Sequence, residues 1–84
     1  MNKKLILKSQ TKGTFYCVLD DTKELVEQLK DIFGFSNGNG MTVDIVNNQV
    51  QLIDFYHWSC VAEFDIISFE DTTEEVTNKF IDIK

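Results

Sequence analysis

Five stretches of the chain alternate apolar and polar residues, and this period of two is typical of β-strands that bury one face. The links between them are short and carry turn residues. Gly13 precedes the second stretch, and Asn47 with Asn48 separates the third from the fourth. Links of this length join neighbouring strands into hairpins, so the sequence predicts an antiparallel sheet. The predicted strands are residues 4–9, 14–19, 41–45, 50–56 and 59–69, the last of them at or near the centre of the sheet.

A helix is predicted between the second and third strands. Asp21 or Thr22 is expected to cap its first turn, and Gly34 is placed to end it in the left-handed conformation. These signals bound the helix at residues 22–33. Four apolar residues recur inside it at the spacing of a single helix face: Leu25, Leu29, Ile32 and Phe33.

The period changes again near the C-terminus. Val76, Phe80 and Ile83 lie four and then three residues apart, which predicts a short helix over residues 73–82. A final strand through residues 80–83 is the alternative.

These elements predict one α+β domain over residues 1–84. It has an antiparallel four- to five-stranded sheet, one long helix and a short C-terminal helix, in the order ββαβββα. No apolar run approaches the roughly 18 residues that a membrane-spanning helix needs. The apolar run near the N-terminus is also too short for the core of a signal peptide, so a cytoplasmic protein with no membrane contact is expected.

Charge is strongly segregated along the chain. The net charge of −6 comes from 14 acidic residues against 8 basic ones, and every base is Lys. Between Asp31 and Asn78 there is no Lys or Arg, although this part holds most of the acids. Phosphate recognition depends on Lys and Arg, so direct nucleic-acid binding is not expected. The acids act either as a solubilising surface or as a surface for a strongly basic partner.

Residues 55–58 are four consecutive rings, Phe-Tyr-His-Trp. In an extended strand they cannot all point into one core, because successive side chains face opposite sides. Either the chain bends here, or a helix covers each face of the sheet, so that the rings fill two small cores. The other interpretation is a partly exposed aromatic patch. Tyr and Trp often dominate the binding energy of protein interfaces.

The sequence shows no catalytic constellation. Cys17 and Cys60 lie in apolar runs and are expected to be buried thiols. His57 and Cys60 have the spacing of half a zinc site, but the chain offers too few further ligands. The acidic surroundings would also raise the pKa of a nucleophilic thiol. A non-enzymatic protein without cofactor or metal is therefore predicted.

The predicted function is inhibition or regulation of a basic protein by occupying its charged groove, the partner being a nuclease or another nucleic-acid-binding enzyme. Phage and mobile-element inhibitors such as anti-CRISPR proteins work in this general way, as do immunity proteins. One alternative is a homodimeric structural or accessory protein with no inhibitory role. Another is a small enzyme, or a carbohydrate or metabolite binder, that uses the rings. The residues expected to contact the partner are Asp54, Tyr56, Trp58, Glu63, Asp65, Glu70, Asp71, Glu74 and Glu75.

Overall fold

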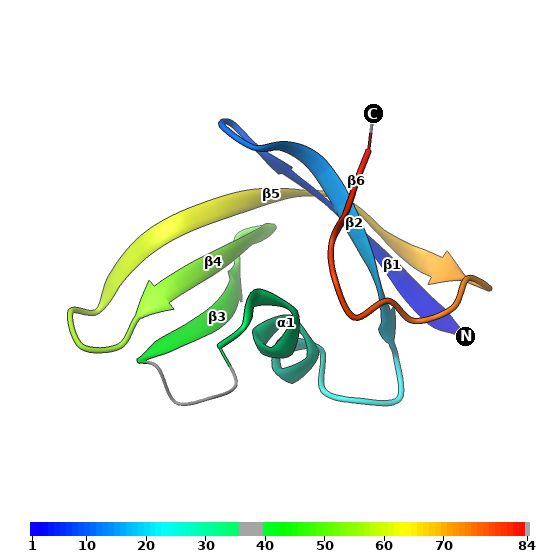
Figure 1. Cartoon of the computed structure of the whole chain (residues 1–84), viewed down its shortest axis with the longest axis horizontal. Helices are drawn as coiled ribbons and strands as arrows, with labels where there is room; N and C mark the ends of the chain where they lie inside the picture. The colour runs from blue at the N-terminus through cyan, green and yellow to red at the C-terminus, as the bar shows by residue number, and fades with distance from the viewer. Residues whose placement is uncertain (36–39, 84) are drawn as a thin grey trace.

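The computed structural model describes residues 1–35 and 40–83, which fold into one antiparallel sheet and one helix (Figure 1). The strand order in the sheet is β3-β4-β5-β1-β2-β6. The elements are β1 (Asn2–Ser9), β2 (Gly13–Asp20), α1 (Leu25–Phe33), β3 (Met41–Val46), β4 (Gln49–Asp54), β5 (Ser59–Thr72) and β6 (Ile81–Asp82). No helix in these residues is long and apolar enough to cross a membrane.

The long strand β5 belongs to both halves of the sheet and curves between them (Figure 1). Its first part, residues 59–65, pairs with β4, and its second part, residues 65–72, pairs with β1. Asp65 has a partner on both sides, Gln49 in β4 and Lys8 in β1. We call β3, β4 and the first part of β5 the first half-sheet, and the second part of β5 with β1, β2 and β6 the second half-sheet.

Two β-bulges change which way the side chains of β5 point. Val61 and Ile67 are extra residues in the register, each lying between neighbouring β5 residues that have partners. A bulge offsets the alternation of faces. Phe69 therefore pairs with buried Leu5 and lies on the same face of the sheet as Phe64, although strict alternation would place the two rings on opposite faces.

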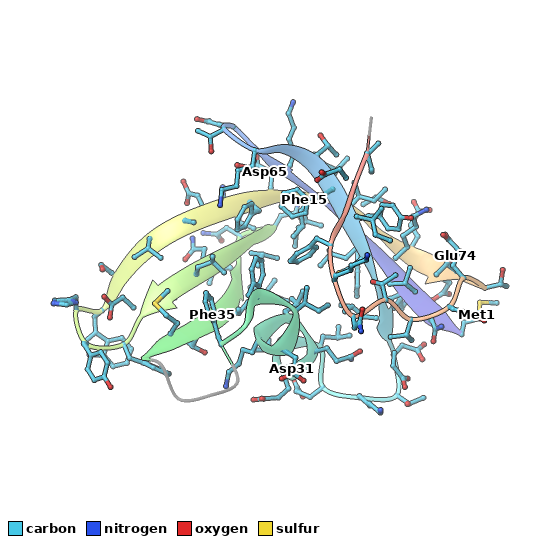
Figure 2. The ribbon with its side chains drawn as sticks, viewed as in Figure 1. Met1, Phe15, Asp31, Phe35, Asp65 and Glu74 are labelled. Atoms are coloured by element: carbon cyan, nitrogen blue, oxygen red, sulfur yellow. The ribbon has the colours of Figure 1, made fainter. Side chains whose placement is uncertain are left out.

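The helix α1 covers one face of the sheet, and the core lies between them (Figure 1). Figure 2 shows Phe15 inside this layer, whereas Asp31 and Asp65 lie on opposite outer sides of the molecule. Leu29 is the fully buried residue of α1. We call the uncovered side of the sheet the open face. The buried core residues are Leu5, Leu7, Phe15, Cys17, Leu19, Leu29, Val43, Val50 and Phe64.

Both predicted hairpins are confirmed, and their turns explain the register. β1 and β2 pair along their whole length, with Gly13 at a φ of 84°. Asn47 and Asn48 have φ values of 50° and 62°, the two left-handed residues of a type I′ turn. The sequence predicts that this strand lies at or near the centre of the sheet, and β5 is the third of the six strands in the observed order.

The predicted start of the first helix is wrong. α1 begins at Leu25 rather than residue 22, and its N-cap residue, Glu24, makes no side-chain capping bond. The Asp20 carboxylate instead accepts hydrogen bonds from the Thr22 backbone N–H (3.0 Å) and hydroxyl (2.6 Å), which hold Thr22 in a turn before the helix. The predicted end is confirmed, because Gly34 has a φ of 83°.

The predicted C-terminal helix over residues 73–82 is wrong as well. This segment is bound along the edge of β2, where the Thr77 N–H donates to the Val18 carbonyl and the Ile83 N–H to the Thr14 carbonyl. It ends as strand β6, close to the alternative of a final strand over residues 80–83. The layout ββαβββα with four or five strands is therefore replaced by ββαββββ with six strands and one helix of 9 residues.

Candidate functional site

The turn between β4 and β5, residues 55–58, carries the most exposed rings of the described chain. It lies at one end of the molecule's long axis (Figure 1). Tyr56 is 78% exposed, Trp58 80% and Phe55 44%, and His57 is also exposed. The chain thus bends here, as one interpretation of the sequence required, but the rings point into solvent rather than into two small cores. We call residues 55–58 the aromatic turn.

The Asp54 carboxylate holds the aromatic turn in shape. Its Oδ1 accepts the Tyr56 backbone N–H at 2.9 Å, and its Oδ2 lies 2.8 Å from the His57 Nδ1. The hydrogen bond from His57 is the main reason that the pKa of Asp54 is lowered, with a smaller contribution from the Tyr56 amide. The Phe55 N–H donates to the Gly40 carbonyl at 2.8 Å, which ties the turn to the start of β3.

Two ring contacts fix the side chains of the turn. Phe55 and Trp58 pack edge to face, with centroids 6.1 Å apart and planes at 83°. The Tyr56 ring lies against Gly40, where a Cβ atom would overlap it. Trp58 has a φ of 49°, a conformation that bulky residues rarely adopt. The turn therefore presents its rings in one defined arrangement.

Next to the turn, the open face of the first half-sheet is acidic. Asp44, Gln51 and Glu63 are partners across β3, β4 and β5, so their side chains form one row. Adjacent strands are about 4.8 Å apart, which places the two acids of this row about 10 Å from each other. In the next row the Gln49 Nε2 donates to Asp65 Oδ1 at 2.9 Å. We call Asp44, Glu63 and Asp65 the acidic face.

The acids of the second half-sheet are matched by lysines from the N-terminal strand. Lys3 lies 2.6 Å from Asp71, and Lys4 lies 3.0 Å from Glu74. Hydrogen bonds from these lysines are the largest causes of the lowered pKa values of the two carboxyl groups, and the bond to Asp71 also raises the pKa of Lys3. Glu70 is the direct cross-strand partner of Lys4.

The structure therefore divides the predicted contact residues between two regions. Asp54, Tyr56 and Trp58 lie together at the aromatic turn, and Glu63 and Asp65 follow on the acidic face. The other four belong to the far end of β5 or to the segment after it, and Figure 2 places Glu74 at the end of the molecule opposite the turn. Those four are Glu70, Asp71, Glu74 and Glu75.

Three polar residues of the open face were not predicted as contact residues, although the sequence indicates their position: Asp44, Gln49 and Gln51. A two-residue turn at Asn47 and Asn48 fixes the pairing of the flanking strands, and that register sets Asp44 beside Gln51.

The two cysteines differ. Cys17 is buried, as predicted, and burial raises the pKa of its thiol to about 12. The expectation of burial is wrong for Cys60, which is exposed and whose Sγ donates to the Ala62 carbonyl at 3.3 Å. Among the residues that the structure describes, no group of three His, Cys or carboxylate side chains is arranged to hold a metal ion.

Comparison of the chain with protein-family models, with curated proteins and with solved structures finds no match. The function is thus inferred from the chemistry of the site. That site consists of a held turn of exposed rings next to a rigid acidic sheet face.

Proposed function

We propose that this chain is a small acidic protein-binding module that inhibits or regulates a basic partner. In this proposal the aromatic turn inserts into the partner, and the acidic face occupies its positively charged groove. The observation that carries the proposal is the exposure of Tyr56 and Trp58, about four-fifths each, on a turn held by the Asp54 carboxylate.

The exposed rings are large enough to anchor a complex. A Tyr or Trp side chain buries roughly 200 Å² when it is fully covered. Covering the four-fifths of Trp58 that is exposed removes about 160 Å² from water, which contributes about 4 kcal/mol at ~25 cal/mol per Å². Tyr56 contributes a similar amount. A turn that is already ordered loses little conformational entropy on binding, so more of this free energy remains as affinity.

The acidic face is the reason that we expect a positively charged partner. Asp44 and Glu63 are held at a fixed spacing on a sheet, as phosphates are held along a nucleic-acid backbone. Residues 41–64 contain no Lys or Arg, although Lys8 of β1 lies across from Asp65 and lines a cavity with Glu63. A well-focused negative field speeds encounter with a basic groove by roughly 10- to 1000-fold. We therefore expect a nuclease or another nucleic-acid-binding enzyme as the partner, with inhibition of the kind that phage and mobile-element proteins perform.

The experiment is affinity capture from a lysate with mass spectrometry, followed by a cleavage or binding assay of the captured enzyme on an oligonucleotide. The double variant Tyr56→Ser with Trp58→Ser is expected to lose capture and inhibition. Glu63→Lys is expected to slow association and to reduce its salt dependence. Val76→Ser is the matched control, because Val76 is exposed and apolar but lies outside the site. Capture and inhibition that survive the double variant unchanged would contradict the proposal.

The same exposed rings support a second candidate, a homodimer that buries the aromatic turn between two copies. Trp58 is the single Trp of the chain, so its fluorescence reports on this turn alone. A blue shift of Trp58 emission with rising protein concentration, together with a dimer in sedimentation, would favour the homodimer over the inhibitor.

A further inference from the structure

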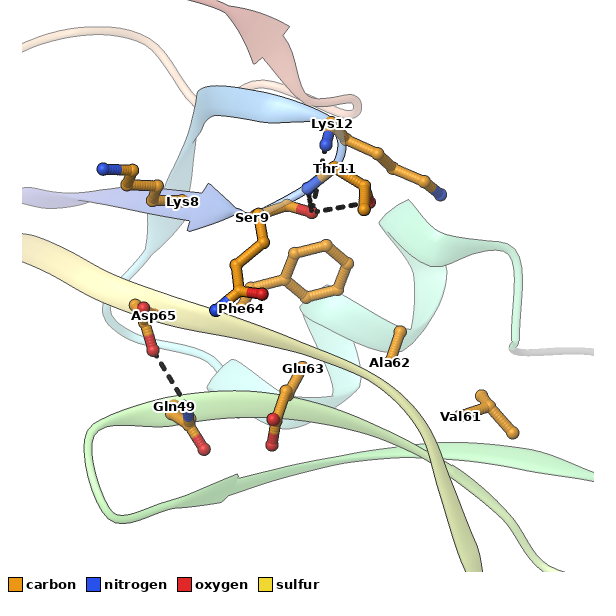
Figure 3. A pocket seen from close by; sticks show the side chains of 11 residues that line it. Lys8, Ser9, Thr11, Lys12, Gln49, Val61, Ala62, Glu63, Phe64 and Asp65 are labelled. Atoms are coloured by element: carbon orange, nitrogen blue, oxygen red, sulfur yellow. Dashed lines mark hydrogen bonds between the residues drawn. The ribbon is translucent and has the colours of Figure 1, made fainter.

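β5 has an edge that no strand of the described chain covers. β4 pairs with β5 from Ser59 to Asp65, but β1 pairs with it only from Asp65 onward. β1 ends at Ser9, and no residue of β1 beyond Lys8 has a register partner in β5. A cavity of about 270 Å³ lies between the hairpin tip and β5 (Figure 3).

The backbone of Glu63 faces this cavity. The Ile66 N–H donates to the Asn48 carbonyl at 3.0 Å, so Ile66 points its backbone groups toward the β4 side. Backbone groups alternate between the two edges of a strand, so Asp65 and Glu63 point theirs the other way. Lys8 of β1 occupies that side at Asp65. The backbone of Glu63 points to the same side as that of Asp65, but it lies beyond the paired end of β1. The cavity is on this side of Glu63.

The charges along the same edge follow a pattern that stops at the cavity. On the open face Lys4 is the cross-strand partner of Glu70, and Lys8 is the partner of Asp65. Glu63 is the next carboxylate on β5, and within residues 1–35 and 40–83 it has no cross-strand partner on this side; Lys8 and Lys12 line the cavity, but neither forms an ion pair with Glu63. A basic residue there would complete the series, because opposite charges directly across two strands attract.

The lining of the cavity is mixed, with polar residues of the hairpin tip, among them Gln10 and Lys12, on one side and apolar residues of β5 on the other. The Ser9 Oγ accepts the backbone N–H groups of Thr11 and Lys12, both at 3.2 Å, which holds the hairpin tip (Figure 3). On the side that faces α1, Phe64 and Ala62 line the cavity. A strand added here would therefore place apolar side chains beside these two residues.

The outer edges of the sheet offer less to an incoming strand. In β3 the Asp44 carboxylate accepts the Ile45 N–H at 2.9 Å, which occupies a donor that an added strand would use. β6 is only 2 residues long.

We propose that the cavity binds an extended segment of a partner protein, which adds to β5 as a strand antiparallel to it and in line with β1. The segment has a Lys or Arg opposite Glu63, with an apolar residue on each side. The basic residue exchanges two backbone hydrogen bonds with Glu63 and pairs with its carboxylate, the mode known as β-augmentation. This site does not depend on the aromatic turn.

The probe is the blocked tripeptide acetyl-Val-Lys-Val-amide, titrated into the ¹⁵N-labelled protein at millimolar concentration. Amide signals of residues 61–65 and of the hairpin tip are expected to shift and to saturate. Glu63→Lys is expected to weaken the tripeptide about fivefold or more and to favour acetyl-Val-Glu-Val-amide instead. Glu75→Lys makes the same change of charge on an exposed residue away from the cavity and is expected to bind like the wild type.

A tripeptide with an N-methylated Lys tests the backbone bonds. It keeps the charge but cannot donate to the Glu63 carbonyl, so it is expected not to bind. Equal binding of the methylated peptide, or no shifts at residues 61–65, would overturn the proposal. Shifts at these residues that grow with protein concentration alone would assign the edge to a second copy and overturn it too. Trp58→Ser is expected to bind the tripeptide normally, so a failure here is distinct from a failure at the aromatic turn.

Discussion

Gly40 lies against the ring of Tyr56 in the aromatic turn, and replacing Gly40 with Ala tests how much this contact contributes to stability. Gly40 has a φ of 81°, and an added Cβ would overlap the ring of Tyr56. Gly13 and Gly34 have φ values of 84° and 83° but no atom within 4 Å of an added Cβ. The three glycines thus share the same backbone strain on substitution, and only Gly40 adds a displaced ring.

The expected free energies of unfolding follow from this difference. An Ala in the left-handed region costs about 1–2 kcal/mol, which sets the loss for Gly13→Ala and Gly34→Ala. Tyr56 is 78% exposed, so about a fifth of its roughly 200 Å² is covered by the protein. Losing that ~40 Å² of contact removes about 1 kcal/mol more, so Gly40→Ala is expected to cost about 2–3 kcal/mol.

Urea unfolding of the three variants, followed by circular dichroism, gives the losses directly. A double-mutant cycle isolates the ring contact: with Tyr56→Ser already present, Gly40→Ala should cost no more than Gly34→Ala, a coupling of about 1 kcal/mol. A coupling energy indistinguishable from zero would refute the view that Gly40 and Tyr56 brace the turn together.

Three further predictions concern the thiols, the turn carboxylate and the core. A thiol reagent should modify Cys60 in the native protein and Cys17 only after unfolding, because burial raises the pKa of Cys17 to about 12; two reactive thiols per native chain would contradict this. His57→Gln should raise the pKa of Asp54 toward its ordinary value, as read from carboxyl chemical shifts against pH. Since the folded pKa of Asp54 lies below the unfolded value, its contribution to stability is complete above about pH 4 and disappears as pH falls through the folded pKa. His57→Gln should therefore reduce the loss of stability in that acid range, and an unchanged acid profile would argue against the pair. Leu29→Ala should cost about 2–5 kcal/mol in urea unfolding because Leu29 is fully buried, and a loss below 1 kcal/mol would show that α1 is loosely packed.

The parts of the fold that depend on local patterning could be predicted from the sequence. Alternation and turn residues located five strands, and Asn47 with Asn48 fixed one hairpin, because a two-residue turn determines both its conformation and its register. Gly34 was placed correctly for the same kind of reason, since the left-handed helix end favours glycine.

The remainder depends on contacts distant in the chain. Val76, Phe80 and Ile83 are spaced like a helix face, yet the segment lies along β2 through backbone bonds to Val18 and Thr14 that no local pattern reveals. Phe80 then packs against Phe15 with ring centroids 5.0 Å apart, so its burial comes from this edge position and not from helical periodicity.

The candidate site was predicted in part for the same reasons. Four adjacent rings left two interpretations open, burial in two small cores or a partly exposed patch, and Tyr56 and Trp58 are exposed. The pairing of Lys3 with Asp71 and Lys4 with Glu74 could not be read from charge counts, because it joins opposite ends of the chain. The bulge at Ile67 likewise changes which acids of β5 share a face, because it brings Glu70 to the open face with Asp65 and turns Asp71 to the opposite face.

The double membership of β5 has a consequence for how this protein comes apart. Its central residue, Asp65, has a register partner in the ladders on both sides, so unfolding of one half-sheet leaves β5 with an uncovered edge beside the other. We therefore expect one all-or-none transition on heating, with the slowest amide exchange at the middle of this strand. Any partner that tightens one end of it should slow the opening of the other.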